Sequence, residues 1–413
     1  MKNIIKNSKK KIYLKWICPD CGKNTPIREK SCINCGSDIS SMILPEGYSN
    51  RDSKAVNLRS VKTVEKLINR GKSYFQKGDD DSISLAIRDF TKAINLDQQN
   101  SYAFYLLGIA KFVSGNIDMP IIYLTKSIKL NPKNSYAFYF RGQAYNSPFQ
   151  FDYDLATKDF TKAIKFTPRY YAIYSRGHAY VSKGDYDLAI KDFTTAIKMI
   201  PKNADPFYWR GCAYSRKGNY DPAIRDFTRA IILTFKKDRT LHSIFQSRGE
   251  GYACKGDYDS AIKDFTRALK FEPANTSIFM DRGKAYSDKG DYDSAIKDFT
   301  KIINDDDFDK TESKYFRAIA YSKKGDYDSA INDFSYAIDL EQLRVKFIYK
   351  FDRSDYKSRR RELARFFYNR GLIYSLKGER SLAIKDFKSA IKLDSKKYKT
   401  ELKQEIEKLK SAS

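Results

Sequence analysis

Histidine, tryptophan and long apolar runs are scarce in this chain of 413 residues. The two histidines, His178 and His242, stand in no nucleophile or metal-ligand motif. No phosphate-binding loop, G-x-S-x-G elbow or dinucleotide fingerprint occurs. We therefore expect a protein that is not an enzyme.

Segments that could enter a membrane are also missing. No stretch approaches the roughly 18 apolar residues that a spanning helix needs. The start, MKNIIKNSKKKIYLKW, is basic but has no apolar run of signal-peptide length. We expect no membrane insertion and a cytoplasmic protein.

Positive charge is abundant. Lysine plus arginine number 77 and aspartate plus glutamate 51, which gives a net charge of +26. This balance favours acidic partners, either proteins or nucleic acid, although a lysine-rich composition would also produce it. Hydrophobic residues make up 41% of the chain, enough to build a core.

One short text recurs at a fixed interval. KGDYDSAIKDF stands at 255–265 and again at 289–299, which is 34 residues later, with close copies from 183 and 324. Each unit predicts a helix, a Gly-Asp turn and a second helix. Gly177 and Ala189 would let two antiparallel helices approach, while Tyr180 and Phe193 fill the space beside the contact. One hairpin cannot bury its apolar face alone, so the units must stack.

The period, with G-x-x-Y, then A-x-x-x-F-x-x-A and often a closing proline, resembles the tetratricopeptide repeat family. About nine units run from 64 to 397, and the resemblance implies an all-α fold, an α-solenoid of helix hairpins. The second unit departs from the pattern, with Lys111 at the tyrosine place and Pro120 expected within its second helix.

Other segments flank or interrupt this array. We expect a basic tail at 1–14, a metal-binding domain at 15–40, a linker at 41–63 and a capping helix at 398–413. An insertion near 342–362 predicts either an extended helix or a basic surface for a partner.

An arginine and an aspartate recur together. Eight units carry Arg before the small residue of the first helix, and eight carry Asp before the Phe of the second; the second unit has Leu107 and Tyr123 instead. We predict a partly buried ion pair between the two helices of each unit, worth roughly 1 kcal/mol or less where exposed. Four such pairs are Arg176 and Asp192, Arg210 and Asp226, Arg248 and Asp264, and Arg282 and Asp298.

Four of the six cysteines form a compact pattern. Cys18, Cys21, Cys32 and Cys35 read C-x2-C, ten residues, C-x2-C. Two such pairs supply the four thiolates of a tetrahedral site, and the pattern resembles a short zinc ribbon. We predict one structural Zn²⁺, with iron in a rubredoxin-like site as the alternative.

A row of aromatic residues marks one face of the first helices. The resemblance implies that this face lines a groove for peptide or protein partners. The candidates are Tyr102, Tyr105, Tyr136, Tyr139, Tyr171, Tyr174, His178, Tyr208, Tyr315 and Tyr368. The alternative is that these rings pack between units.

We therefore predict a protein-interaction scaffold with a structural zinc ribbon. The alternative function is nucleic-acid binding through the ribbon and the tail. Residues 1–17 carry six lysines and no acid, a composition suited to phosphate contacts.

Overall fold

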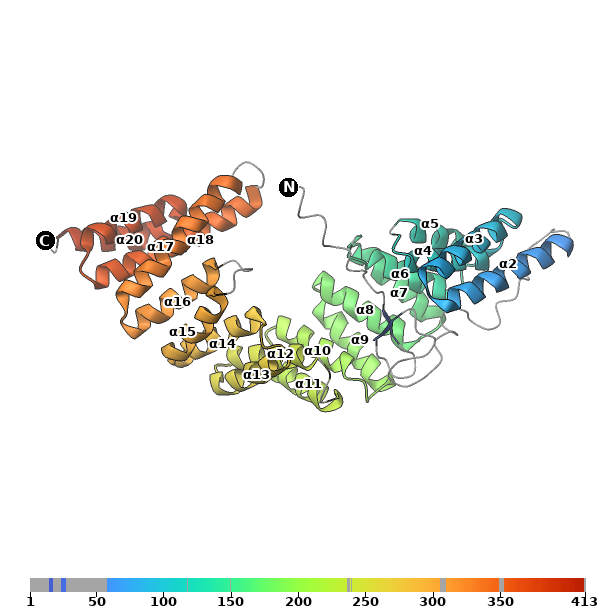
Figure 1. Cartoon of the computed structure of the whole chain (residues 1–413), viewed down its shortest axis with the longest axis horizontal. Helices are drawn as coiled ribbons and strands as arrows, with labels where there is room; N and C mark the ends of the chain where they lie inside the picture. Colours follow the sequence, from blue (N-terminus) through green and yellow to red (C-terminus); the bar gives the residue numbers. More distant parts are fainter. Residues whose placement is uncertain are drawn as a thin grey trace. The chain divides into compact units, whose positions relative to one another are not determined.

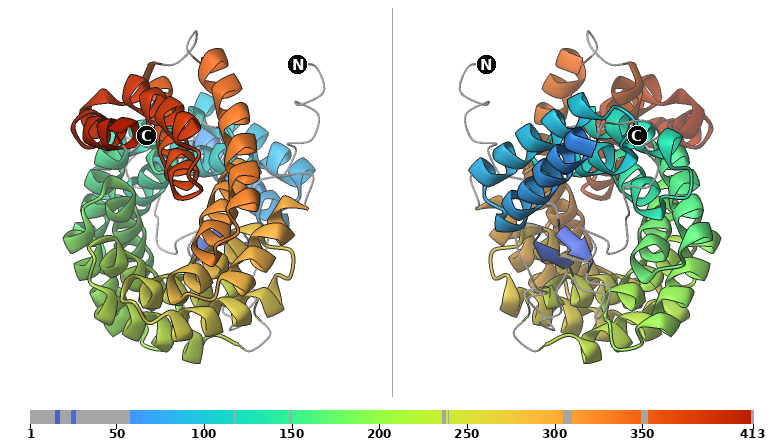
Figure 2. Two further views of the ribbon diagram at one scale, coloured as in Figure 1. Left: turned by 90° about the vertical axis from the view of Figure 1, so that its left-hand side faces the viewer. Right: turned by 90° about the vertical axis from the view of Figure 1, so that its right-hand side faces the viewer.

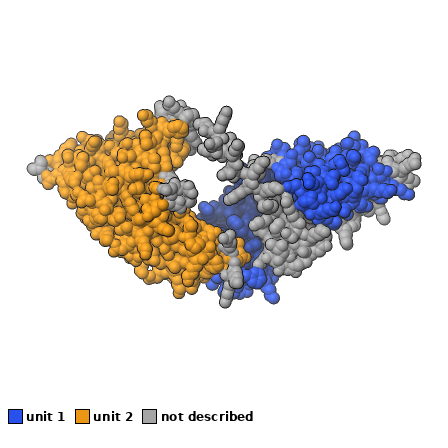
Figure 3. Space-filling view, in the orientation of Figure 1, with its two compact units in different colours: residues 1–235 blue, residues 236–413 orange. Residues whose placement is uncertain are grey.

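The computed structural model describes residues 15–17, 24–26, 58–116, 118–148, 150–235, 238, 240–304, 310–348 and 353–411. The chain divides into two compact units, Met1–Phe235 (unit 1) and Lys236–Ser413 (unit 2) (Figure 3). The division falls in the segment FKKDRT, where the sixth repeat starts later than the 34-residue period requires.

Two short strands precede the helices. The strand β1 (Lys15–Ile17) pairs antiparallel with β2 (Asn24–Pro26), and Trp16 lies opposite Thr25. Cys18 and Cys21 stand in the connection between the strands, but all four predicted metal ligands lie outside the described residues.

Unit 1 contributes ten described helices, which pair as five hairpins (Figure 1). They are α2 (Leu58–Lys77), α3 (Asp80–Leu96), α4 (Ser101–Val113), α5 (Met119–Leu130), α6 (Ser135–Tyr145), α7 (Tyr153–Phe166), α8 (Tyr170–Lys183), α9 (Tyr186–Met199), α10 (Asp205–Arg216) and α11 (Tyr220–Leu233). The first helix, α2, begins six residues before the predicted start of the array at 64.

Unit 2 contributes nine described helices, four hairpins and a last helix. They are α12 (Leu241–Cys254), α13 (Tyr258–Phe271), α14 (Thr276–Lys289), α15 (Tyr292–Ile303), α16 (Thr311–Lys324), α17 (Tyr327–Ile348), α18 (Arg353–Leu376), α19 (Arg380–Leu393) and α20 (Ser395–Ser411). The last helix, α20, covers α19 and buries Tyr398, Leu402 and Ile406.

The glycine and aspartate of the repeated sequence set the helix boundaries. Gly184 ends α8 in the left-handed region, with φ of 88°, which favours glycine over residues with a Cβ. In unit 2 the Asp257 side chain accepts a hydrogen bond from the Ser260 backbone N–H at 3.1 Å and caps α13. The Gly-Asp turn therefore both stops one helix and starts the next.

The core of each hairpin is built from the repeated alanine and phenylalanine. Ala189, Phe193 and Ala196 on α9 are fully buried, and the same positions are buried in the other described second helices. Successive hairpins within a unit lie side by side (Figure 2). In such a stack each hairpin covers the apolar face of its neighbour.

The second repeat corrects one expectation. Pro120 is the second residue of α5, so it lies in the first turn rather than within the helix. Because the first backbone N–H groups of a helix have no intrahelical acceptor, proline costs little there. Leu107 and Tyr123 stand in place of the ion pair: Leu107 is buried, and Tyr123 packs half-buried against the same core.

The insertion near 342–362 falls largely within two long helices. It extends α17 to Ile348 and α18 back to Arg353, with 349–352 outside the described residues. The buried Glu341 of α17 accepts a hydrogen bond from Arg359 of α18 at 3.2 Å and fixes the two helices together. Across the described part of the chain, every helix is too short or too polar to cross a bilayer.

Candidate protein-interaction site

The predicted arginine and aspartate pairs lie together in the structure. Arg176 on α8 donates from Nε to Asp192 Oδ2 and from Nη2 to Oδ1, both at 2.8 Å. Asp192 is buried and Arg176 is largely so. The same two-pronged contact recurs in Arg210 with Asp226, Arg248 with Asp264, Arg282 with Asp298, and in the pairs headed by Arg70, Arg141, Arg317 and Arg370.

A hydroxyl group of the preceding repeat completes this contact, and the sequence reasoning missed it. Arg176 Nη1 donates to Thr161 Oγ1 at 3.0 Å, so one guanidinium joins two repeats. Equivalent bonds link Arg141 to Thr125, Arg210 to Thr194, Arg282 to Thr266, Arg317 to Thr300 and Arg370 to Ser335. The signal was present: Thr or Ser follows the phenylalanine (leucine in the second repeat) in eight repeats.

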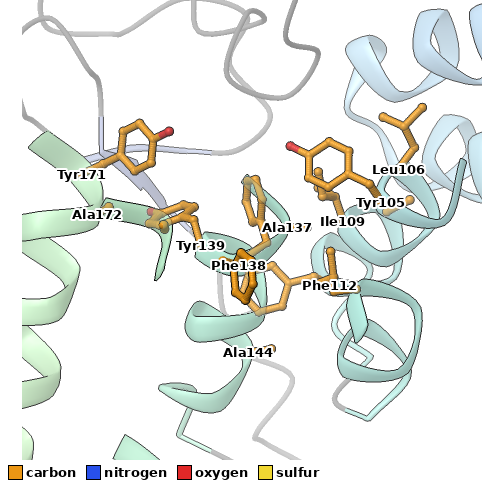
Figure 4. Packing of buried hydrophobic residues seen from close by; sticks show 14 of the residues in the cluster. Tyr105, Leu106, Ile109, Phe112, Ala137, Phe138, Tyr139, Ala144, Tyr171 and Ala172 are labelled. Atoms are coloured by element: carbon orange, nitrogen blue, oxygen red, sulfur yellow. The ribbon is translucent and has the colours of Figure 1, made fainter. Parts of the chain in front are cut away.

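The aromatic face of unit 1 is formed by the first helices of its hairpins, where α4 neighbours α6 and α8 neighbours α10. Tyr139 on α6 lies edge-on to Tyr171 on α8, with ring centroids 4.5 Å apart (Figure 4). Its hydroxyl accepts a hydrogen bond from Gln143 Nε2 at 2.7 Å. Burial raises the pKa of Tyr139 to about 12. This ring is a packing element between two repeats.

His178 occupies the neighbouring position along the face. Its ring lies edge-on to Tyr174 at 4.5 Å and to Trp209 of α10 at 4.2 Å, and it also meets Phe193. Burial among these rings lowers the pKa of His178 to about 3, so the imidazole is neutral at physiological pH. Neutral histidine and tryptophan together form an aromatic patch that carries no charge.

The ten groove candidates differ in how deeply they are buried. Five of the ten rings are buried, so the alternative that they pack between units describes them: Tyr105, Tyr139, Tyr171, Tyr174 and Tyr315. The other five are half-buried: Tyr102, Tyr136, His178, Tyr208 and Tyr368. Trp209, also half-buried, extends this group and was missed because its position lies one residue after Tyr208.

The row is interrupted in unit 2. Gln246 and Met280 stand where unit 1 has tyrosines. Gln246 Nε2 donates to Asp281 Oδ2 at 2.7 Å, which makes this stretch polar. Tyr315 packs 4.8 Å from Phe366 and its hydroxyl accepts from Asn369, while Tyr368 stacks on Tyr398 of α20. The accessible aromatic edge is therefore concentrated in unit 1.

In the described part of the chain, no three His, Cys, Asp or Glu side chains gather as metal ligands. The residues gathered on the first-helix face are aromatic and amide side chains. Such a surface suits non-covalent recognition of another chain.

Family models match several segments of the array. The tetratricopeptide repeat models match residues 204–234, 311–342, 364–397 and 249–309, and a further TPR repeat model matches 177–218. The chain therefore carries tetratricopeptide repeats, as the sequence resemblance implied. Proteins with these repeats generally mediate protein–protein interactions.

Solved structures of other repeat proteins are similar in part. MamA protein is 26% identical, with 42% of this chain and 92% of that chain covered and a TM-score of 0.39. YrrB, described as a TPR protein with an unusual peptide-binding site, is 19% identical over 45% and 92%, with a TM-score of 0.40. A tetratricopeptide repeat protein from Parabacteroides merdae is 19% identical over 63% and 99%, with a TM-score of 0.45. No curated protein sequence matches.

Proposed function

We propose that this chain is a non-enzymatic scaffold that binds a peptide or protein segment on the first-helix face of unit 1. One observation carries the proposal: the half-buried edge formed by Tyr136, His178, Tyr208 and Trp209. Aromatic residues held rigidly at a surface commonly anchor protein interfaces. The rings pack on buried aromatic residues, His178 on Tyr174 and Phe193 and Tyr208 on Phe227, so little entropy is lost on binding.

Charge and polarity at this edge indicate what it would accept. His178 is neutral, and Arg169 lies over the ring of Tyr136 at 5.6 Å. An extended segment with apolar or aromatic side chains and an acidic residue near Arg169 would fit. The net charge of +26 favours acidic partners in general.

The test is a pull-down with metal-loaded protein, followed by affinity measurements on the recovered partner. We expect Trp209→Ala to weaken binding by roughly tenfold or more. Tyr186→Ala, which removes another half-buried ring of unit 1 from α9, serves as the matched control and should change affinity little. Equal affinities for both variants would reject the proposed face.

We also propose that the four N-terminal cysteines hold one structural Zn²⁺. The antiparallel strands β1 and β2 bracket Cys18 and Cys21 in the sequence, and a hairpin around the first cysteine pair is the arrangement that a ribbon needs. Four thiolates would leave no open coordination position, so the ion would stabilise the fold rather than act on a substrate.

The alternative function is nucleic-acid binding by residues 1–17 and the ribbon. The salt dependence of binding distinguishes it from the scaffold function. Removing residues 1–17 would then weaken binding to RNA or DNA and flatten its dependence on salt. If the proposed scaffold function holds, that deletion leaves partner binding nearly unchanged.

A further inference from the structure

The exposed side of the second helices in unit 1 mixes basic and apolar side chains. On α7 it consists of Leu155, Lys158, Lys162, Lys165 and Phe166, all of them exposed. At 100° per residue these five side chains fall within about 100° of the helix circumference. They therefore form a single stripe, opposite the buried Phe160.

Neighbouring hairpins carry the same stripe. On α9 it comprises Leu188, Lys191, Lys198 and Met199, again exposed. On α5 the exposed Met119 and Ile122 are followed by Lys126 and Lys129. The large apolar side chains of these two helices keep between 41% and 59% of their surface accessible. The stripes on α5, α7 and α9 together are termed the basic–apolar face.

The positive charge of this face is not neutralised within the described residues. The exposed acidic side chains of α7 and α9, Asp154 and Asp187, lie in the first turn of each helix. Asp154 pairs with Lys183 at 2.9 Å, and Asp187 pairs with Lys217 at 2.5 Å, in each case a lysine of the following repeat. Lys158, Lys162 and Lys191 form no ion pair with any described residue. The lysines thus remain available to an anionic partner.

The apolar part of the stripe is not required by the repeat. Relative to the buried phenylalanine, Leu155 and Leu188 occupy the place that Ser260, Ser294 and Ser329 occupy on α13, α15 and α17 of unit 2. The amino-acid sequences of these second helices are otherwise similar. The same place on α19 of unit 2 holds an exposed leucine, Leu382, so the fold accepts either residue there. Exposed leucine is unfavourable in water.

We propose that the basic–apolar face of unit 1 binds the surface of a bilayer that contains anionic lipids, and lies on it without spanning it. Lysines contact the phosphate head groups, and the tips of leucine, methionine and phenylalanine enter the boundary between head groups and acyl chains. Nucleic acid would use the lysines but would gain nothing from the aliphatic tips. The combination of both residue types selects the lipid surface.

Vesicle co-sedimentation with the full chain tests the proposal. The protein should bind vesicles of mixed phosphatidylglycerol and phosphatidylcholine and should not bind pure phosphatidylcholine. Lys158→Gln combined with Lys191→Gln should lower the partition coefficient at least tenfold, since each lysine near an anionic surface contributes about fivefold. Leu155→Ser combined with Leu188→Ser should lower it several-fold while leaving the helical circular dichroism unchanged.

The matched control is Lys263→Gln combined with Lys297→Gln. These lysines have the same register on α13 and α15, next to the serines, and the substitution removes the same charge. It should leave vesicle binding nearly unchanged. An equal loss in the control would overturn the proposal, because net charge alone would then drive binding. It would also be overturned if the leucine variants bound like the unchanged protein, or if duplex DNA, RNA or an acidic peptide bound more tightly than the vesicles.

Discussion

Gly177 on α8 lies directly against the ring of Phe193 on α9: a Cβ atom at position 177 would lie 2.8 Å from Cε1 of that ring. Real Cβ atoms essentially never approach so closely, and the buried ring has no free space to move into. The same relationship holds between Gly211 and Phe227 in the next repeat. Glycine stands at this place in eight of the nine hairpins, and Ala318 takes it in the hairpin of α16 and α17.

Gly177→Val should therefore destabilise unit 1 by about 1–3 kcal/mol through overpacking. Hydrogen exchange of α8 and α9 is the suitable measurement, since a repeat array need not unfold as one cooperative unit. Ser182→Val, at an exposed position of the same helix, is the control and should have little effect. Similar protection in both variants would contradict this account of the glycine.

Arg176→Ala should cost about 3 kcal/mol, because it leaves the carboxylate of Asp192 buried and without its main partner. The control, Lys183→Ala, breaks an exposed pair with Asp154 and should cost less than about 1 kcal/mol. Chemical denaturation of the variants, followed by circular dichroism, provides the comparison.

A double variant distinguishes loss of the pair from loss of packing. Arg176→Leu with Asp192→Tyr copies Leu107 and Tyr123 of the second repeat and should recover much of the lost stability. If Arg176→Ala is no worse than Lys183→Ala, the ion pair has no structural role.

The stability of unit 1 should decrease as the pH falls below about 6.5. His178 takes up its proton at about pH 3 in the folded chain but at about 6.5 when unfolded, so acid favours the unfolded state between these values. The loss should approach 1.4 kcal/mol per pH unit. Hydrogen exchange of α8 between pH 7.5 and 5.5 avoids most carboxylate titration, with rates corrected for intrinsic pH dependence.

Substitution separates this histidine from other titrating groups. His178→Phe should remove most of the pH dependence, whereas His242→Gln, in the other unit, should preserve it in α8. A pH dependence that survives His178→Phe would show that another group causes it.

Metal content tests the ribbon. Protein purified without chelator should carry about one Zn²⁺ per chain by elemental analysis, and Cys32→Ser with Cys35→Ser should abolish this. The control, Cys254→Ser, should leave the zinc content unchanged. Chelation should expose the β1 and β2 amides to exchange and spare the helical signal; purified protein free of metal would refute the site.

The repeats could be predicted because glycine, phenylalanine and the arginine–aspartate pair recur in the sequence at nearly constant spacing. Residues at the same spacing make the same contacts in each hairpin. The extent to which each tyrosine is buried could not be predicted. Helical periodicity places Tyr139 and His178 on one face, but burial depends on the side chains of the next hairpin, such as Tyr171 and Trp209. Interactions between repeats were the less predictable part.

The last hairpin lacks the Thr or Ser hydroxyl that follows the phenylalanine, or Leu124, in the other eight repeats. Lys388 takes this place in the last hairpin, after which no further arginine of a repeat arrives, and α20 covers the surface instead. In six of the other repeats the hydroxyl accepts a hydrogen bond from the arginine of the following repeat, so the stack is polar along its length and its last hairpin cannot replace an internal one. A tenth hairpin added after α19 in place of α20 would meet a lysine where its arginine needs an acceptor, so lengthening the array would first require Lys388→Thr.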